Sequence, residues 1–210
     1  MVTHEHTDHI KSLGNLSKKF NLPVFATPET FDAMPKQSEK ISDANKKNIN
    51  IDESFSIKDI TIKPFAIPHD AANPCGFTFI YNGTKMSIAT DIGHMNLNIL
   101  NKLEGSSFIL LESNYDPDIL KCSSYPYYLK QRIMSNEGHL PNKMAGKTIA
   151  YLLNSGLNNV VLGHLSKENN FPELAYKTVV EELMNKNFDE NSIKISIADR
   201  NKPSNNFKIN

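Results

Sequence analysis

The sequence predicts an α/β protein, an α+β layered arrangement with helices packed outside a β-sheet. Three observations support this prediction. Strand-like and helix-like segments alternate along the chain, strand runs are repeatedly followed by helices, and no long linker, repeat or low-complexity block interrupts that order. Such alternation is typical of sheets covered by helices. We therefore expect residues 1–210 to form one domain.

Apolar spacing and capping residues predict the first elements. Leu13, Leu16 and Phe20 recur at helical spacing and should share one face. Thr27 is placed to cap a helix that begins at Pro28. The expected elements are a helix over residues 10–21, a strand over 22–26, a short helix over 28–34, and a solvated helix or loop over the polar stretch 35–49.

Two hairpins and several later elements complete this prediction. Residues 55–57 and 60–67 should pair around Lys58-Asp59, and the strand pair around Asn82-Gly83 has the strongest short hairpin signal. That second pair is expected over residues 76–81 and 84–90, followed by strands over 108–111, 160–163 and 192–198 and by helices over 126–136, 142–155 and 174–186.

Composition places the chain among globular proteins. With 39% hydrophobic residues in 210, it can bury a sizeable core without disulfides. No apolar run approaches the ~20 residues of a membrane span and no leader-like segment is present, so we expect a cytoplasmic protein. Cys75 and Cys122 lack metal-ligand spacing and are assigned no role. The formal net charge of zero argues against nucleic-acid binding by the whole surface but leaves room for a local basic patch.

Six residues near the start of the chain concentrate metal-binding side chains. They read His4-Glu5-His6-Thr7-Asp8-His9 and hold three of the seven histidines. On a short loop, His4 and His6 can bind one cation while Asp8 and His9 reach toward a second. The alternative is an accidental polar turn. It is disfavoured because chance histidine clusters seldom include an Asp at the start of a helix.

The His-x-His-x-Asp-His pattern resembles the signature of the metallo-β-lactamase fold superfamily. The resemblance implies an αββα sandwich with three further ligands downstream. His69 would complete the triad of the first metal, Asp91 would bridge both metals, and His164 would be the last ligand of the second. Each follows a strand-like run, and ligands that project from strand ends converge on one rim of a sheet. Taken singly, a His at a strand end is more often a hydrogen-bonded structural residue.

Further stretches resemble the nucleic-acid-processing branch of the superfamily, which includes tRNase Z, and above all the YycJ/WalJ group of bacterial nucleases. In that branch an acidic residue and an extra histidine flank the metals, which implies catalytic roles for Glu112 and His139. The alternatives are that His139 caps the helix that starts near Asn142 and that Glu112 holds a neighbouring histidine. The resemblance covers essentially the whole chain through Pro68-His69-Asp70-Ala71-Ala72, Leu111-Glu112-Ser113-Asn114, Tyr125-Pro126, Lys130-Gln131-Arg132-Ile133, Gly138-His139-Leu140 and Gly163-His164-Leu165-Ser166.

The implied chemistry is metal-dependent hydrolysis of a phosphodiester. Histidine and aspartate ligands without a thiolate suit two divalent ions, Zn²⁺ or Mn²⁺, which at about 3.5–4 Å apart can activate a bridging hydroxide. Asp8 would orient or deprotonate that hydroxide, and His139 would bind the phosphate or protonate the departing oxygen. Four cations near His139 either track a nucleic-acid backbone or form a solvated helix face: Lys130, Arg132, Lys143 and Lys147.

We therefore expect a DNA exonuclease that acts from a 5′ end, with DNA favoured over RNA as its partner. One alternative keeps the fold and hydrolyses a lactone, thioester or similar small carbonyl compound, chemistry that does not need His139 and Glu112. Another is an inactive, truncated chain that at most binds metal.

The position of the motif raises one further expectation. In the superfamily it follows several N-terminal strands, whereas here it begins at residue 4. We therefore expect an N-terminally incomplete fragment, or a second polypeptide that supplies those strands. Uncovered apolar faces would then favour aggregation or a homodimer, and His4, beside a mobile terminus, would bind its metal weakly.

Overall fold

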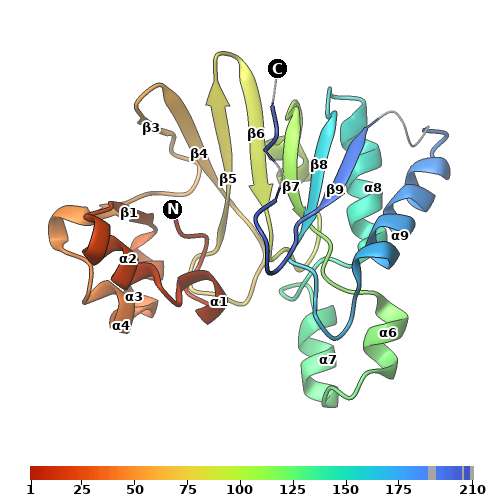
Figure 1. Cartoon of the computed structure of the whole chain (residues 1–210), viewed down its shortest axis with the longest axis horizontal. Helices are drawn as coiled ribbons and strands as arrows, with labels where there is room; N and C mark the ends of the chain where they lie inside the picture. The colour runs from red at the N-terminus through yellow and green to blue at the C-terminus, as the bar shows by residue number, and fades with distance from the viewer. Residues whose placement is uncertain (189–192, 205, 209–210) are drawn as a thin grey trace.

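A mixed seven-stranded β-sheet forms the centre of the structure (Figure 1). The computed structural model describes residues 1–188, 193–204 and 206–208, and within them the strand order is β3-β4-β5-β6-β7-β8-β9. This confirms the predicted α/β class. The strands are β3 Phe55–Ile57, β4 Ile60–Ala66, β5 Cys75–Tyr81, β6 Thr84–Ala89, β7 Phe108–Glu112, β8 Asn159–Gly163 and β9 Lys194–Ile197.

The first four strands of this sheet form two antiparallel hairpins, as their turn residues predict. β3 pairs with β4, β5 pairs with β6, and β4 joins the hairpins by pairing with β5. Lys58, Asn82 and Gly83 have φ angles of 53°, 47° and 80°. A tight hairpin turn requires this left-handed conformation, which Asn and Gly adopt at the least cost.

The remaining strands run parallel, and their direction determines where the site lies. β6, β7, β8 and β9 are parallel to one another. β4 points the same way because it is two antiparallel steps from β6. The carboxyl ends of these strands therefore meet along one edge of the sheet, called the carboxyl edge below. Three short helices lie beside this edge in Figure 1: α1 Thr7–Ile10, α6 Pro117–Cys122 and α7 Tyr127–Met134.

Three further helices cover one face of the parallel strands. They are α5 Leu97–Leu103, α8 Asn142–Leu153 and α9 Pro172–Met184, and α8 also packs against α9. Burial of each large aliphatic side chain here contributes roughly 1.5–3 kcal/mol, which fixes the strand ends that carry the site. The core between sheet and helices includes Ile109, Leu111, Val160 and Leu162 from the strands and Ile149, Leu152, Val179 and Leu183 from the helices.

Residues 1–48 form a separate N-terminal unit with its own small core. Strands β1 and β2 pair in parallel, and the core consists of Val2, Ile10, Val24, Ala26, Phe31, Met34 and Ile41. The amide of Val2 donates to Phe25 O (2.9 Å), and that of Cys75 donates to Thr3 O (3.0 Å). The segment before His4 is thus fixed between β1 and β5, contrary to the expected mobile neighbour of His4. Besides α1, the unit comprises α2 Leu13–Phe20, β1 Val24–Ala26, α3 Pro28–Ala33, α4 Pro35–Ser38, the 3₁₀ helix Asp43–Asn45 and β2 Lys46–Asn48.

The helix predicted over residues 10–21 is present but starts later, as α2 from Leu13 to Phe20, and it follows the short helix α1. Leu16 and Phe20 are 48% and 57% exposed. The buried positions of α2 are Gly14 and Ser17, because a side chain at Gly14 would lie 2.7 Å from Gln37 O. The close approach of α4 selects small residues for the inner face, so the large apolar residues point outward.

Other elements were also missed or shifted. The polar stretch 35–49 contains strand β2, which hydrophobicity does not reveal because its residues are Lys46, Lys47 and Asn48. Helices α5 and α6 were not predicted, although Asn96 and Asp116 cap them through their side chains. The other predicted helices and strands are present with shifts of a few residues at their ends. Position 192 of the predicted last strand lies outside the described residues.

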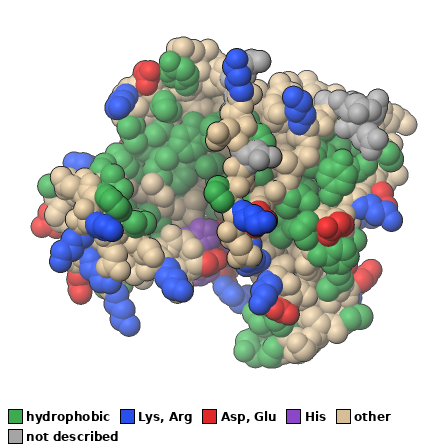
Figure 2. Space-filling view, viewed as in Figure 1, with side chains coloured by type: hydrophobic (Ala, Val, Ile, Leu, Met, Phe, Trp, Pro, Cys, Tyr) green, Lys and Arg blue, Asp and Glu red, His purple; other side chains and the backbone are tan. Residues whose placement is uncertain are grey.

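Hydrophobic side chains gather on the face of β3 to β6 that points toward the viewer in Figure 2. Phe79 and Met86 are neighbours across the β5–β6 pair, and both are half-buried, as are Ile57 and Ile88. Association of the chain through this face stays a prediction. Among the helices that the structure describes, none is long and apolar enough to cross a membrane.

Candidate metal centre

The residues predicted as metal ligands or catalytic groups come together at the carboxyl edge. Their visible imidazoles lie at the base of the recess between the N-terminal unit and the rest of the molecule (Figure 2). His4 and His6 precede α1, which carries Asp8 and His9. The other residues come from the ends of β4, β6, β7 and β8 and from the loop before α8: His69, Asp91, Glu112, His164 and His139.

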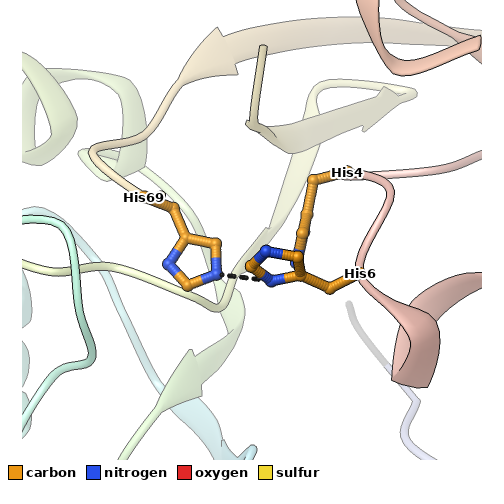
Figure 3. A group of neighbouring side chains, drawn as sticks. All are labelled: His4, His6 and His69. Atoms are coloured by element: carbon orange, nitrogen blue, oxygen red, sulfur yellow. Dashed lines mark hydrogen bonds between the residues drawn. The ribbon is translucent and has the colours of Figure 1, made fainter. Parts of the chain in front are cut away.

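His4, His6 and His69, called the histidine group below, face one another (Figure 3). One ring nitrogen from each lies within 4.8 Å of the others, and His69 Nε2 is 3.2 Å from His6 Nδ1. His69 Nδ1 lies 3.1 Å from the carbonyl oxygens of Glu137 and Gly138. Because carbonyls only accept, Nδ1 carries the hydrogen and Nε2 presents its lone pair to the group.

Thr3 orients two of the imidazoles, a role that the sequence did not suggest. Its hydroxyl oxygen lies 3.1 Å from His4 Nδ1 and 3.1 Å from His9 Nδ1. His4 is fully buried, and among the described residues its Nε2 has no hydrogen-bond partner. Burial, followed by the neighbouring His9 and His69, lowers the pKa of His4 to about 2. His4 therefore offers a neutral nitrogen, the form that binds metal.

Asp91 lies between the histidine group and His164. Its Oδ1 is 3.7 Å from His69 Nε2 and 3.4 Å from His164 Nε2, and its Oδ2 is 3.4 Å from His9 Nε2. Asp91 is 1% exposed, and within the described part of the chain its Oδ2 accepts no hydrogen bond. Asp8 also lies beside His164, with its Oδ2 3.5 Å from His164 Nε2. Asp8, His9 and His164 form a further group of possible ligands.

Asp91 and His164 also share an unusual backbone conformation. Their φ angles are 61° and 56°, in the left-handed region where non-glycine residues cost of order 1–3 kcal/mol each. His164 directly follows β8 and Asp91 lies two residues after β6. Neighbouring amides hold both turns: Gly93 N donates to Pro68 O (2.8 Å) and Ser166 N donates to Asn114 O (2.8 Å). The strain turns each side chain back toward the site.

Glu112 lies behind the imidazoles and is fully buried. Its Oε1 is 2.8 Å from Nδ1 of both His139 and His164, and its Oε2 accepts from the amides of Ile92 (2.8 Å) and Leu140 (3.0 Å). Burial opposes ionisation, but the bonds from His139 and His164 hold the pKa of Glu112 below its usual value. This geometry favours the alternative in which Glu112 holds neighbouring histidines. Asp91, Glu112, His139 and His164 are called the strand-end group below.

His139 does not cap α8, because the residue at the N-cap is Pro141 and makes no side-chain cap. Because Nδ1 of His139 is hydrogen-bonded to Glu112, its Nε2 atom remains available to a ligand in the cleft. His94 lies outside these groups, and its Nδ1 donates to Asn136 O (2.9 Å).

Asp70 and Arg132 form an ion pair at the rim that sequence reasoning did not identify. Arg132 donates from Nε and a terminal nitrogen to the two carboxylate oxygens of Asp70, at 2.5 and 2.9 Å. Asp70 Oδ1 is in turn 3.6 Å from His69 Nε2 and 3.9 Å from His6 Nε2. The only sequence signal was the Asp directly after His69.

A cleft of about 930 Å³ opens beside these groups. Of the four cations predicted to track a backbone, only Arg132 lines it. Lys130 donates to Lys121 O and Ser123 O (2.7 Å each), and Lys143 lies 3.9 Å from a carboxylate oxygen of Glu182. These contacts favour the alternative in which Lys130 and Lys143 belong to a helix face outside the cleft. The cleft is lined by Asp8, His9, His139 and His164 at the site and farther along by Tyr125, Arg132, Lys167, Phe171 and Arg200, among others.

These donors suit divalent metal ions. The buried Nε2 of His4 and Oδ2 of Asp91 lack partners within the described residues, and buried polar atoms are rarely left unpaired. Although burial opposes it, hydrogen bonds with Asp8 and Glu112 raise the pKa of His164 to about 11, so the surrounding carboxylates favour positive charge here. Nitrogen and oxygen donors without a thiolate suit Zn²⁺ or Mn²⁺. Cys75 is no competitor, because burial raises its pKa to about 12.

Comparisons with known proteins identify similar chains. A family described as "Beta-lactamase superfamily domain" matches residues 1–165. "Exodeoxyribonuclease YycJ" of Bacillus anthracis is 35% identical over 188 residues, which is 90% of this chain and 71% of that protein. The metallo-β-lactamase fold protein YhfI of Bacillus subtilis has a TM-score of 0.63 at 18% identity, over 93% of this chain and 72% of that one. Zinc-bound PqqB of Methylobacterium extorquens has a TM-score of 0.61 at 16% identity, over 93% and 69%. At these identities, the two solved structures establish the fold alone.

Proposed function

The chain belongs to the β-lactamase superfamily and is a metal-dependent hydrolase, and from that premise we propose that it is an exonuclease acting on DNA. The observation that carries the proposal is the cleft, in which the candidate metal ligands Asp8, His9 and His164 share one cavity with three cationic residues, Arg132, Lys167 and Arg200. Cationic side chains beside a metal centre suit a phosphodiester backbone. The name of the relative from Bacillus anthracis supports DNA as the substrate.

In this proposal two divalent ions, Zn²⁺ or Mn²⁺, bind at the site. The histidine group would hold one of them, Asp8, His9 and His164 would hold the other, and Asp91 would contribute to both. Bound ions of this kind supply Lewis acidity, which lowers the pKa of a water molecule and offsets the charge of a phosphodiester.

Asp8 orients the attacking water and accepts its proton. The hydrogen bond to His164 holds the pKa of Asp8 below its usual value, so the carboxylate is ionised. Asp8 is exposed and lines the cleft beside His9 and His164, which leaves it within reach of a water molecule at the metal ligands. A positioned base of this kind contributes roughly 10²–10⁴-fold to the rate.

His139 donates a proton to the departing oxygen. Its Nδ1 lies 2.8 Å from Glu112 Oε1, which holds the ring in place and leaves Nε2 for the leaving group. The position of His139 on the cleft wall suits a leaving group that extends away from the metal ligands.

Arg132 binds the phosphate. The pair with Asp70 holds its guanidinium at the rim with two hydrogen bonds, so the planar donor set is preorganised for a second set of oxygens. Arg132 lies in the same cavity as Asp8 and His139, where a phosphodiester would meet all three residues.

The test is a nuclease assay on the purified chain. Single- and double-stranded DNA labelled at the 5′ or 3′ end, RNA of the same sequence, and a lactone and a thioester are each incubated with Zn²⁺ or Mn²⁺. We expect stepwise DNA shortening that Asp8→Asn abolishes and that the exposed Lys147→Ala variant on α8 leaves unchanged. Turnover of the lactone or thioester without DNA cleavage would overturn the proposal.

A further inference from the structure

We propose that Phe171, Lys167 and Arg200 form a subsite for a single strand of nucleic acid, in which one base stacks on the Phe171 ring and the backbone pairs with the two cations. The inference rests on the proposed nuclease function and adds to it the part of the substrate that is held away from the scissile bond.

Phe171 is an exposed aromatic residue in the same cleft as the candidate metal ligands. Its side chain is 47% exposed, and it occupies the N-cap position of α9. It makes no side-chain cap there, so α9 does not require the ring. The buried positions of α9 are filled by Ala175, Val179, Val180 and Leu183, so the core does not use it either. A large ring left half-exposed to solvent on the wall of this cleft is available to a planar ligand.

The backbone that carries Phe171 is held firmly. The amide of Phe171 donates to the side-chain oxygen of Asn170 (3.0 Å). Asn170 is buried, and its Nδ2 lies within 3.0 Å of Ser113 O, Asn114 O and Asn142 Oδ1. Pro172 then fixes the first turn of the helix. A rigid mount lowers the entropy that stacking would otherwise cost.

The same network connects the ring to the candidate metal centre. Asn114, whose carbonyl accepts from Asn170, also donates from Nδ2 to His164 O (2.7 Å). Its carbonyl further accepts from Ser166 N (2.8 Å), next to Lys167. The fold therefore fixes the distance between a base stacked on Phe171 and the phosphate that is cleaved. A fixed distance would let the site position the end of an approaching strand.

Two cations on this wall suit phosphates of the same strand. Lys167 and Arg200 are exposed and line the cleft. Arg200 is anchored by a hydrogen bond from its guanidinium to Leu165 O, which leaves further donors free. The nearby Asp199 carboxylate accepts from the amides of Asn201 (2.7 Å) and Lys202 (3.0 Å), so it is engaged in its own turn. An aromatic ring in a groove that also carries cations is the usual construction of sequence-tolerant single-strand sites.

Stacking selects single strands over duplexes. A base can place its face on Phe171 only when it is unpaired and unstacked from one neighbour, whereas a duplex offers only its edges and backbone. We therefore expect the subsite to prefer single-stranded ends or overhangs.

The first experiment exploits the absence of tryptophan from the sequence. Phe171→Trp introduces a single tryptophan, which can be excited selectively at about 295 nm because tyrosine absorbs little there. The metal-loaded protein is titrated with a phosphorothioate-linked thymidine dodecamer, which resists cleavage. We expect saturable quenching, at least about fivefold weaker binding for a duplex of equal length, and weaker binding again when Lys167 or Arg200 is replaced by Ala. The matched control is Tyr176→Trp, which is on α9 but outside the cleft lining and should show no quenching. No quenching at Phe171→Trp, or equal quenching at both positions, would overturn the subsite.

The second experiment separates the subsite from the chemistry. Phe171→Ala should raise KM for single-stranded DNA by roughly five- to a hundredfold, the range of one lost base stack, with thermal stability unchanged. Its turnover of bis(p-nitrophenyl) phosphate should equal that of the wild type, because this diester has no nucleobase and no second phosphate for the subsite, and Phe171→Tyr should restore KM. Equal losses on both substrates would refute the inference. A wild-type protein inert toward both would refute the proposed function instead, while the fluorescence titration would still decide the subsite.

Discussion

Thr3 and Glu112 each orient two histidines of the site, one from the N-terminal unit and the other from the sheet, and they differ in charge. Each places one side-chain oxygen against Nδ1 of two histidines, Thr3 at 3.1 Å from His4 and His9 and Glu112 at 2.8 Å from His139 and His164. Thr3 is a half-buried neutral hydroxyl on the N-terminal unit, whereas Glu112 is a fully buried carboxylate at the end of β7.

The comparison shows that an imidazole can be oriented by a neutral hydroxyl or by a carboxylate. Bonds to a charged acceptor are worth about twice those to a neutral one, and Glu112 also accepts two backbone amides. We therefore expect the strand-end group to tolerate change less well than the histidine group, with Asp91 as the point where both meet. Four experiments test this comparison.

The largest effect is expected at Asp91, which contacts both sides. Asp91→Ala should lower the metal content from about two divalent ions toward none and reduce nuclease turnover by at least about 10⁴-fold, the upper end for a single group. His164→Ala should instead remove mainly one ion. Metal analysis after dialysis, with Lys147→Ala as the control, measures both. A His164→Ala protein that keeps both ions at wild-type occupancy would contradict the assignment.

His139 should separate chemistry from metal binding. With its Nδ1 on Glu112 and its other nitrogen left for the cleft, His139→Ala should leave the metal content intact while the nuclease rate falls by roughly 10²–10⁴-fold. Parallel metal analysis and initial rates check this. Loss of metal together with activity would make His139 a ligand of the strand-end group.

Replacing the two orienting residues compares them directly. Glu112→Gln keeps the shape of the side chain but replaces one acceptor oxygen with an NH₂ donor. That donor would face either the two imidazole hydrogens or the two backbone amide hydrogens. Metal affinity should therefore fall by about 10–100-fold, and the urea midpoint of unfolding should drop. Thr3→Val removes a neutral acceptor and should cost at most roughly tenfold. Chelator competition and urea unfolding give both numbers. A larger loss at Thr3→Val than at Glu112→Gln would reverse the comparison.

The same contrast explains how much the sequence could predict. His4, His6, Asp8 and His9 lie within six positions, so their spacing alone indicates a shared metal site, and hairpin and strand patterns predict most of the sheet. Glu112 and His139 are 27 positions apart, and no local pattern links them. Their selection came from family resemblance, which does not state whether Glu112 faces the metal or stands behind the histidines.

The residues that sequence reasoning missed are those whose roles depend on tertiary contacts. Thr3, Asp70 and Phe171 are ordinary residues in the sequence. They become notable only because the fold places Thr3 between two imidazoles, Asp70 against Arg132, and Phe171 on a cleft wall. The buried face of α2 has the same cause, because the contact of α4 with Gly14 outweighs apolar spacing in deciding which side chains are buried.

The smallest predicted effect concerns the contact between the N-terminal unit and the seven-stranded sheet. Cys75 is fully buried where β5 meets the N-terminal unit, with Sγ 3.6 Å from Thr3 O, whereas Cys122 is exposed. A thiol reagent should therefore modify Cys122 at once and reach Cys75 only when the N-terminal unit opens.

Metal bound between His4 and His6 on that unit and His69 on the sheet side would oppose this opening, since a ligand that binds only the closed form stabilises it. In the Cys122→Ser variant, saturating Zn²⁺ or Mn²⁺ should slow Cys75 modification on the order of tenfold, and His6→Ala should reduce this protection more than His139→Ala does. Equal protection in both variants would mean that the histidine group does not tie the N-terminal unit to the sheet.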